Sequence, residues 1–327
     1  MVIRVGLVGL GMAVAPHARS LADLGPRVEV VHAYSPSAER RVKFAERFRF
    51  PLCDRLETIL EDRSVGAVLI LTPPNTHLEL VQRFAAAGKH ILLEKPLEIS
   101  TARADQLVRS AANVKLGVVL QHRFRPAAEK LGEILKSGQL GELVSASAMI
   151  PNWRPQSYYD QPGRGTRARD GGGVLLTQGI HTLDLFLSLT GKVSEVKSFS
   201  TTTGVHRMET EDLVAAAVRF ENGALGVVHA TTAACPGFPE RIELIGTRGT
   251  ALLEGTSLKV QFIAGDAFEF RTESGAGGTG ADPMAFPHDW HRSLLADFLD
   301  AIEHGRAPRV SGEEALNVHR FIDALLA

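Results

Sequence analysis

The chain has 327 residues, about twice the length of a typical domain, so we expect two domains. Hydrophobic residues make up 44% and charged residues 22% of it, as in an ordinary soluble globular protein. A net charge of -1 argues against a nucleic-acid-binding surface, and no apolar run has the length of a membrane span. Cys53 and Cys235 form no metal-ligand spacing, and the first residues show no signal peptide, so we expect a cytoplasmic protein.

A strand over residues 2–8, a glycine turn and a helix over residues 13–24 are predicted at the start of the chain. Gly9 permits the tight turn, and Gly11 lets the backbone approach a pyrophosphate at the N-terminus of the helix. Val14 replaces the third glycine of the dinucleotide fingerprint. The pattern indicates a dinucleotide site, and a βα turn without a ligand is the alternative. The expected cofactor contacts here are Gly9, Gly11, Met12 and Ala13.

The second strand, over residues 28–34, ends where NAD-binding domains usually place a carboxylate that bonds the ribose hydroxyls. Ser35 occupies this place, so no negative charge repels a 2′-phosphate, and Arg40 and Arg41 stand nearby. We therefore expect NADP(H) as the favoured cofactor, with Ser35 and Arg40 among its contacts. NAD(H) is the alternative, which holds if the arginines lie on the solvated face of a helix over residues 38–48.

A third apolar strand, over residues 67–71, is followed by a proline-rich turn and a helix that runs to residue 87. The prolines either carry the chain over the edge of a cofactor or form a turn without a ligand. Asn75 or Thr76 is expected to cap the helix. The expected cofactor contacts are Thr72, Pro73, Asn75 and His77.

The apolar run over residues 91–93 is typical of a central parallel strand that is buried on both faces. Lys95 follows it, where strand ends face the ligand crevice of an α/β sheet. A partly desolvated lysine has a lowered pKa and acts as an acid or a base. Pro96 limits the backbone of Lys95 to extended conformations, and the bond between the two residues can be cis. A solvated turn is the alternative. A helix over residues 100–112 and a strand over residues 115–120 follow.

Three of these segments together resemble the motifs of one protein family. Gly9-Leu10-Gly11 with His17, residues 72–77 and Glu94-Lys95-Pro96 are similar, in order and spacing, to the glucose–fructose oxidoreductase / inositol dehydrogenase (Gfo/Idh/MocA) family. The resemblance implies that Glu94 and Lys95 contact the cofactor. It also implies an α/β fold class, with a Rossmann dinucleotide-binding domain followed by an α+β domain.

The implied domains cover residues 1–121 and residues 122–327, and the second carries a large, mostly antiparallel sheet for substrate binding and oligomerisation. Residues 221–223 are predicted to form a hairpin turn, and the glycine-rich residues 274–282 a mobile loop. Strands are expected over residues 143–150, 193–202, 213–220, 224–232, 241–245, 250–253 and 258–262. Helices are expected over residues 127–137, 290–303 and 312–326, the last two free to pack back on the first domain.

Three glycines at residues 171–173 lead into a predicted helix with Thr177 and His181 four residues apart, and therefore on one face. The resemblance places the family's catalytic histidine at His181, and an aspartate or asparagine where this chain has Thr177. A threonine cannot be an anionic base, so Lys95 and His181 remain as the pair that handles the proton, and Thr177 is a hydrogen-bond partner of the substrate. A core histidine bonded to backbone is the alternative for His181. Asp184 either orients His181 or pairs at the surface.

Aromatic and arginine side chains before this helix are candidates for a substrate pocket, because arginines clamp carboxylates or phosphates and rings lie on sugar C–H faces. A solvated or interface loop is the alternative. No metal is expected, since His288 with His291 alone is a weak ligand pair. The expected substrate contacts are Lys95, Arg123, Trp153, Arg154, Tyr159, Thr177, Gln178 and His181, among which Lys95, Thr177 and His181 are also the expected catalytic residues.

These residues predict an NAD(P)-dependent oxidoreductase that moves a hydride between nicotinamide and a hydroxyl or ketone of a sugar, polyol or sugar acid. The resemblance leaves two alternatives, a non-catalytic regulator that senses the dinucleotide and an NAD-dependent glycoside hydrolase. It implies a homodimer or homotetramer through the exposed face of the large sheet. No nucleic-acid or membrane partner is expected.

Overall fold

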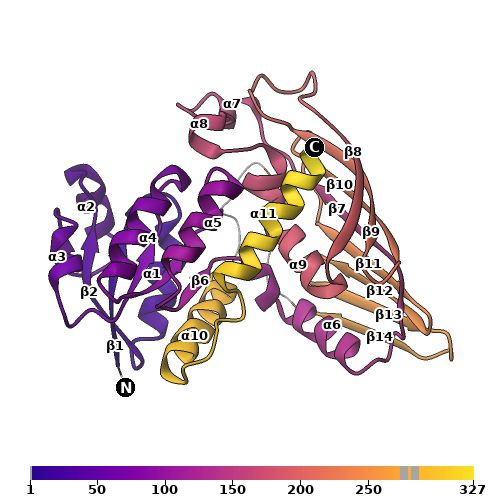
Figure 1. The fold of residues 1–327 in the computed structure, drawn as a ribbon, viewed down its shortest axis with the longest axis horizontal. Helices are drawn as coiled ribbons and strands as arrows, with labels where there is room; N and C mark the ends of the chain where they lie inside the picture. Colours follow the sequence, from indigo (N-terminus) through magenta and orange to yellow (C-terminus); the bar gives the residue numbers. More distant parts are fainter. Residues whose placement is uncertain (1, 273–278, 281–286) are drawn as a thin grey trace. The chain divides into compact units, whose positions relative to one another are not determined.

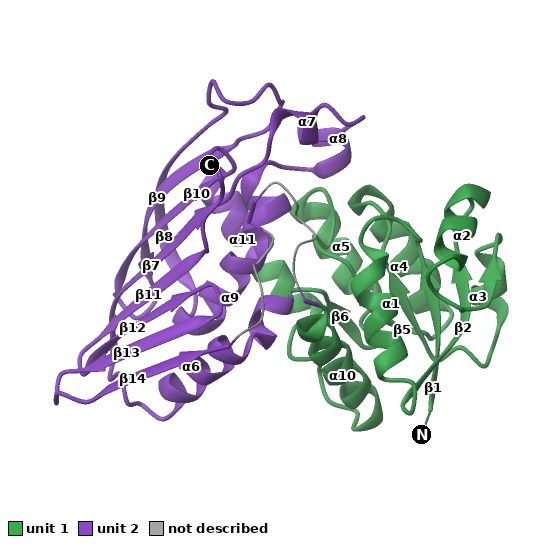
Figure 2. Ribbon diagram, turned by 180° about the vertical axis from the view of Figure 1, so that it is seen from behind, with its two compact units in different colours: residues 1–120, 288–317 green, residues 121–287, 318–327 purple. Residues whose placement is uncertain are grey.

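The computed structural model, drawn in Figure 1, describes residues 2–272, 279–280 and 287–327. The chain divides into two compact units, which have different colours in Figure 2. Unit 1 contains Met1–Leu120 and His288–Asn317, and unit 2 contains Gln121–Pro287 and Val318–Ala327. The C-terminal part of the chain thus contributes to both units.

Unit 1 is built on a six-stranded parallel sheet with the order β3-β2-β1-β4-β5-β6. This is the strand order of a Rossmann fold, and the order reverses between β1 and β4. The strands are β1 (Ile3–Val8), β2 (Val28–Tyr34), β3 (Leu52–Cys53), β4 (Ala67–Ile70), β5 (His90–Leu93) and β6 (Leu116–Val118). The helices are α1 (Val14–Asp23), α2 (Ala38–Ala45), α3 (Glu57–Glu61), the 3-10 turn η1 (Pro74–Thr76), α4 (His77–Ala86), α5 (Thr101–Ser110) and α10 (Asp289–Glu303).

The central strands of unit 1 are buried because their sequences are continuously apolar. Every residue of β4 is buried, and so are the last three residues of β5. Such runs are stable only when helices cover both faces of a parallel sheet. Helix α10 packs against α1 and β5, and Gly117 of β6 leaves room for Phe298 of α10, since a Cβ atom there would lie 3.0 Å from the ring.

Unit 2 is built on an eight-stranded sheet with the order β14-β13-β12-β11-β7-β10-β9-β8. Neighbouring strands are antiparallel except for β7 and β10. The strands are β7 (Leu143–Pro151), β8 (Val193–Thr201), β9 (Leu213–Phe220), β10 (Leu225–Thr231), β11 (Arg241–Gly246), β12 (Gly249–Glu254), β13 (Ser257–Phe262) and β14 (Ala267–Arg271). The helices are η2 (Gln121–Phe124), α6 (Pro126–Lys136), α7 (Gln156–Tyr159), α8 (Arg167–Asp170), the π-helix η3 (Leu175–Gly179) and α9 (Ile180–Thr190), and α11 (Gly312–Leu326) runs from unit 1 into unit 2.

The sheet of unit 2 has one buried and one exposed face. Buried and exposed residues alternate along β9 from Val214 to Phe220, which is the pattern of an antiparallel sheet with one solvated side. Helix α6 packs against β12 and β13, and α9 packs against β7. Figure 1 shows both helices on the same side of the sheet.

The fold class predicted from the sequence is confirmed, because a Rossmann sheet precedes a large and mostly antiparallel sheet. The predicted hairpin turn is also present, with Gly223 N–H donating to the Phe220 carbonyl oxygen at 2.9 Å. The sequence prediction missed β3, α3, β14 and the short helices α7 and α8, which are too brief to show a clear periodicity. The predicted loop at residues 274–282 lies largely outside the described residues. None of the described helices combines the length and apolar composition of a membrane span.

Candidate active site

The glycine turn after β1 is shaped by the start of the loop after β4. Gly9 has a φ of +101°, and a Cβ atom there would lie 2.9 Å from the backbone carbonyl of Leu71. Both features require glycine. Gly11 differs, because a Cβ atom there would meet no described atom within 4 Å. This open space fits the close approach of a pyrophosphate.

The N-terminus of α1 follows the glycine turn and suits an anion. Among the described residues no side chain caps it, and its first turn holds no acidic residue. Val14 N–H bonds to the Gly11 carbonyl oxygen at 3.3 Å and Pro16 has no N–H, so it is the positive end of the helix dipole that fits a dinucleotide phosphate. Val14, in place of the third glycine, is 6% exposed, whereas Met12 is 55% exposed and Ala13 is half-buried.

Ser35 follows β2 directly, as predicted, and it is buried. Its hydroxyl accepts a hydrogen bond from Ser37 N–H at 3.3 Å, and Arg41 donates to its carbonyl oxygen at 2.6 Å. Arg40, the predicted phosphate contact, is exposed on α2. Arg41 is therefore the arginine that the structure holds beside Ser35.

His77 ties the loop after β4 to the loop after β5. Its Nε2 lies 2.9 Å from the carbonyl oxygen of Thr72. Its Nδ1 lies 3.0 Å from the carbonyl oxygen of Pro96 and 3.1 Å from that of Leu97. The ring is fully buried, and this burial lowers its pKa against the opposing effect of the three carbonyl groups. The prediction placed His77 at the cofactor, but both ring nitrogens face backbone, so its visible role is to hold the Lys95 loop.

The turn between β4 and α4 differs from the predicted capped helix start. Thr76 makes no cap hydrogen bond to α4, and its hydroxyl donates to the Pro73 carbonyl oxygen at 2.8 Å. The hydroxyl groups of Thr72 and Thr76 lie 2.7 Å apart. Pro73 and Asn75 are exposed at this turn, as predicted cofactor contacts must be.

Lys95 stands just beyond the carboxyl end of β5, half-buried, and its bond to Pro96 is cis. The Oε2 atom of Glu94 accepts a hydrogen bond from Lys95 N–H at 2.9 Å, and its Oε1 atom lies 2.9 Å from His17 Nε2. Burial alone would raise the Glu94 pKa, but the hydrogen bond from His17 and the charges of His17 and Lys95 hold it below its ordinary value. Glu94 is therefore an ionised carboxylate that touches the backbone of Lys95.

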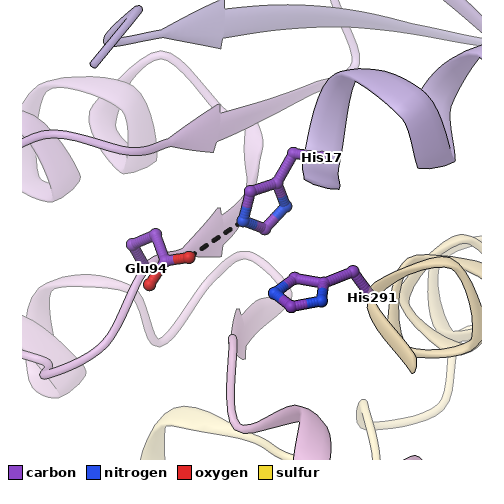
Figure 3. A group of neighbouring side chains, drawn as sticks. All are labelled: His17, Glu94 and His291. Atoms are coloured by element: carbon purple, nitrogen blue, oxygen red, sulfur yellow. Dashed lines mark hydrogen bonds and ion pairs between the residues drawn. The ribbon is translucent and has the colours of Figure 1, made fainter. Parts of the chain in front are cut away.

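His291 of α10 lies beside His17 of α1 and Glu94, as Figure 3 shows. The two histidine rings meet edge to face, with centroids 5.1 Å apart. Burial, and secondly repulsion from His17, lower the His291 pKa to about 3, so its ring is neutral at pH 7. The ligand atoms of the three residues lie within 4.8 Å, but the 2.9 Å between His17 and Glu94 is a proton-bridged hydrogen bond. The sequence prediction considered His288 with His291 only as a weak ligand pair, and His288 lies 2.8 Å from Asp23.

In unit 2 the three glycines lead into a π-helix, so the prediction of a regular α-helix is wrong here. A Cβ atom on Gly173 would lie 1.8 Å from the Glu211 carbonyl oxygen, which requires glycine. The Glu211 carboxylate accepts hydrogen bonds from Gly173 N–H at 3.0 Å and Leu175 N–H at 3.3 Å. Burial raises its pKa above the ordinary value. No local pattern identifies Glu211 as the partner of this turn, because it lies on a distant part of the chain.

The π-helix changes the relation between Thr177 and His181. The predicted common face assumed regular α-helical geometry, but Thr177 lies in the π-helix and His181 in α9. The wider turn rotates the side chains that follow it, and such turns often occur at functional sites. The Thr177 hydroxyl lies 2.6 Å from the Gly173 carbonyl oxygen and also close to Gln178 Oε1, so these two acceptors share its single proton.

His181 stacks on His122, with ring centroids 4.9 Å apart and planes 30° apart. Arg125 donates to the Nε2 atom of His122, and because an arginine has no acceptor, this nitrogen carries no proton. His122 is therefore the neutral Nδ1–H form. Arg125 is 3% exposed, and burial lowers its pKa against the attraction of Glu240 at 3.5 Å. The sequence prediction missed both His122 and Arg125.

Arg123, a predicted substrate contact, binds Asp184 through two hydrogen bonds. Its Nε lies 2.7 Å from Oδ2, and its Nη2 lies 2.6 Å from Oδ1. Asp184 is fully buried, so it is not the surface pair that the sequence left open. This bidentate bond ties η2 to α9 and so helps to place His122 beside His181.

The segment that carries the predicted substrate contacts Trp153, Arg154 and Tyr159 packs around His206. Its Nδ1 lies 2.6 Å from Asp212 Oδ2, and its Nε2 lies 2.8 Å from the Arg154 carbonyl oxygen. The ring of Tyr159 meets it at 4.9 Å, and burial raises the Tyr159 pKa to about 12. Arg154 is buried and donates to the carbonyl oxygen of Trp153 at 2.7 Å. Tyr159 and Arg154 thus support this segment, and Trp153 is half-buried.

Two family models match this chain. One, described as "Oxidoreductase family, NAD-binding Rossmann fold", matches residues 3–122, and the other, "GFO/IDH/MocA C-terminal domain", matches residues 128–252. The chain belongs to the GFO/IDH/MocA family of oxidoreductases. The family assignment confirms the resemblance found in the sequence. Lys95 of this GFO/IDH/MocA protein belongs to unit 1 and His181 to unit 2, so their pairing remains a prediction.

Curated relatives and solved structures agree with the GFO/IDH/MocA assignment. Myo-inositol 2-dehydrogenase of Thermotoga maritima is 26% identical, with 95% of this chain and 92% of that protein aligned. The 1,5-anhydro-D-fructose reductase of Ensifer adhaerens is 29% identical over 88% of this chain and 85% of that protein. The WlbA dehydrogenase of Bordetella pertussis, solved with NADH and UDP-GlcNAcA, is 25% identical, with a TM-score of 0.84 and coverage of 100% and 96%.

Proposed function

We propose that this oxidoreductase is a nicotinamide-dependent dehydrogenase or reductase for a CH–OH group of a sugar, polyol or sugar acid, or for its ketone. The observation that carries the proposal is Lys95, which the structure holds at the carboxyl end of a central Rossmann strand through Glu94 and His77. Ligands of such sheets bind at this edge. The curated relatives are a dehydrogenase of an inositol and a reductase of an anhydrosugar, which supports the substrate class.

The proposed chemistry divides the work between the cofactor and two side chains. Oxidation of an alcohol requires a base for the hydroxyl proton while the hydride leaves the carbon. The bound nicotinamide supplies the hydride acceptor. Uncharged Lys95 takes the proton, and its ammonium form returns it in the reverse direction. His181 is the second side chain that handles the proton. Thr177 and Gln178 form hydrogen bonds to other oxygen atoms of the substrate.

The remaining proposed substrate contacts fall into two groups. Arg123 acts mainly by tying η2 to α9, and Arg154 and Tyr159 by holding the segment around Trp153, because each bonds to protein partners in the folded unit. Trp153 is half-buried, so its ring is the better candidate for contact with a sugar face.

We also propose NADP(H) as the favoured cofactor. Ser35 brings no carboxylate to the end of β2, and the guanidinium of Arg41 is anchored at the Ser35 carbonyl oxygen. A 2′-phosphate at this place would gain a charge-assisted hydrogen bond from Arg41. Arg40 was the predicted contact, and its exposure makes it the weaker candidate.

We further propose a cytoplasmic homodimer or homotetramer that associates through the exposed face of the large sheet. Phe199 on the edge strand β8 is 87% exposed, and on the inner strand β10 Leu225 is 53% and Val227 49% exposed. Leu225 and Ile245 both pair with Ser145 of β7, so they lie in one row across the sheet. Exposed apolar side chains that gather on one face of a sheet are rarely left uncovered.

A screen of sugars, polyols and sugar acids with both cofactors, read at the nicotinamide absorbance, tests the activity. Lys95→Ala and His181→Asn serve as inactive controls. Turnover that depends on both residues supports the dehydrogenase. Tight dinucleotide binding with no turnover supports a regulator instead, and cleavage of a glycoside without net change in the cofactor supports the hydrolase.

A further inference from the structure

We propose that Glu94 is a positioning residue that fixes the place of Lys95 and sets the pH at which Lys95 loses its proton, and that His17 holds Glu94 in this role. The inference rests on the proposed acid–base function of Lys95. It explains the presence of a half-buried carboxylate that takes no part in the proposed reaction.

The geometry in Figure 3 links three separate segments of unit 1. One carboxylate oxygen of Glu94 accepts from the backbone N–H of Lys95, and the other bonds to His17, which α1 supplies. The Glu94 side chain is 12% exposed and that of His17 1% exposed, so neither can move freely. Because α1 begins at the glycine turn, the same chain of bonds runs from the proposed phosphate site to the lysine.

The charge of Glu94 has a second effect. A carboxylate that attracts an ammonium group favours the protonated lysine, and a pair within about 4–6 Å shifts such an equilibrium by about one to three pH units. The groups that face Glu94 are His17 from α1, Lys95 from its own loop and His291 from α10, and His288 in turn faces His291. His291 is neutral, so it does not cancel the carboxylate charge.

A shared metal ion is the rival explanation of this group. Two histidines and a glutamate are acceptable ligands for Zn²⁺, and their ligand atoms lie within 4.8 Å. In that case the metal ion, rather than a hydrogen bond, would hold the Glu94 carboxylate in place. The positive charge of the metal would also offset the effect of Glu94 on the protonation of Lys95. A chelator distinguishes the two explanations, because it shifts the Lys95 midpoint only if a metal ion is bound.

Glu94→Gln tests the proposal because it keeps the shape of the side chain and removes its charge. The pH dependence of Lys95 acylation, followed by mass spectrometry of the labelled peptide, reports its protonation without any assay of turnover. We expect the midpoint to fall by about one pH unit in Glu94→Gln. Glu94→Ala should lower kcat at least about tenfold, and Glu94→Gln should recover much of that loss.

Glu98→Gln is the matched control. Glu98 is a fully buried carboxylate of the same loop, but its bonds run to Leu78 N–H, Ile99 N–H and Arg103. Its substitution should lower stability and leave the Lys95 midpoint unchanged. His17→Phe should lower kcat as Glu94→Ala does, because Glu94 then loses its anchor.

An unchanged Lys95 midpoint in Glu94→Gln would overturn the proposal. It is equally overturned if EDTA shifts the wild-type midpoint and Zn²⁺ restores it. A shifted midpoint that leaves the pH profile of kcat unchanged would uphold the role of Glu94 and would instead remove Lys95 from the proposed reaction.

Discussion

The ring of His181 stacks on the ring of His122 at a centroid distance of 4.9 Å. Behind this pair, Arg125 donates to His122 in the interior of unit 2. The buried guanidinium opposes a further positive charge on the adjacent ring. The arrangement therefore places the neutral ring of His122 against the ring of His181.

His122→Phe should retain the stacked ring and remove the acceptor of Arg125. We expect the free energy of unfolding to fall by about 1–3 kcal/mol, because a buried charged donor loses its partner. We also expect kcat to fall about tenfold, because the neighbour of His181 is less firmly placed. Urea unfolding and steady-state kinetics measure the two effects, and an unchanged stability would contradict the proposed bond.

Lys95→Ala should lower kcat at least about a hundredfold, which is the usual scale for the loss of a general acid–base group. Dinucleotide affinity should change little, because the glycine turn and α1 are left intact. Lys43→Ala is a suitable control, since Lys43 is an exposed lysine of the same unit paired with Glu39. Wild-type turnover in Lys95→Ala would remove Lys95 from the mechanism.

Arg41→Ala should weaken NADP(H) by about ten- to a hundredfold, which corresponds to the loss of one charge-assisted bond of about 1.5–3 kcal/mol. NAD(H) should be spared, and Arg40→Ala should have a smaller effect, because Arg40 is exposed. Ser35→Asp should reverse the preference by placing a negative charge beside the phosphate. Calorimetric titration of both cofactors measures the preference. A wild type that prefers NAD(H) would contradict the proposed 2′-phosphate site at the end of β2.

Phe199→Glu should dissociate the proposed oligomer, because it places a charge on the exposed face of the large sheet. Ile263→Glu is the control, since Ile263 is 77% exposed in the turn that follows β13. Light scattering at micromolar concentration distinguishes the states. A wild-type protein that is already monomeric would refute the interface.

His291 should make the protein less stable in mild acid. Its pKa is about 3 when folded and 6.5 ordinarily, so between these values the unfolded chain binds a proton that the folded chain does not. Stability from this group is present above pH 6.5 and is lost as pH falls toward 3, by about 1.4 kcal/mol per pH unit. Urea unfolding of wild type and His291→Phe at pH 7 and pH 5 measures the difference. An equal loss in both proteins would contradict the assignment.

The sequence by itself determined the parallel sheet and the place of Lys95. The apolar runs of β4 and β5 are long enough to require burial on both faces, and a lysine directly after such a strand must lie at its carboxyl end. Gly9 was also identifiable, because a tight turn between a strand and a helix needs a residue that tolerates positive φ. These features depend on neighbours in the chain, so local patterns reveal them.

Only the tertiary structure decided which distant residues support these sites. Glu94 bonds to His17, and Gly173 meets Glu211, across separations that no local periodicity spans. The π-helix before His181 likewise forms where the Glu211 carboxylate binds the N–H groups at its start, although the sequence there suits an ordinary helix. Packing selects such partners because a buried polar group must find a hydrogen bond wherever the folded chain supplies one.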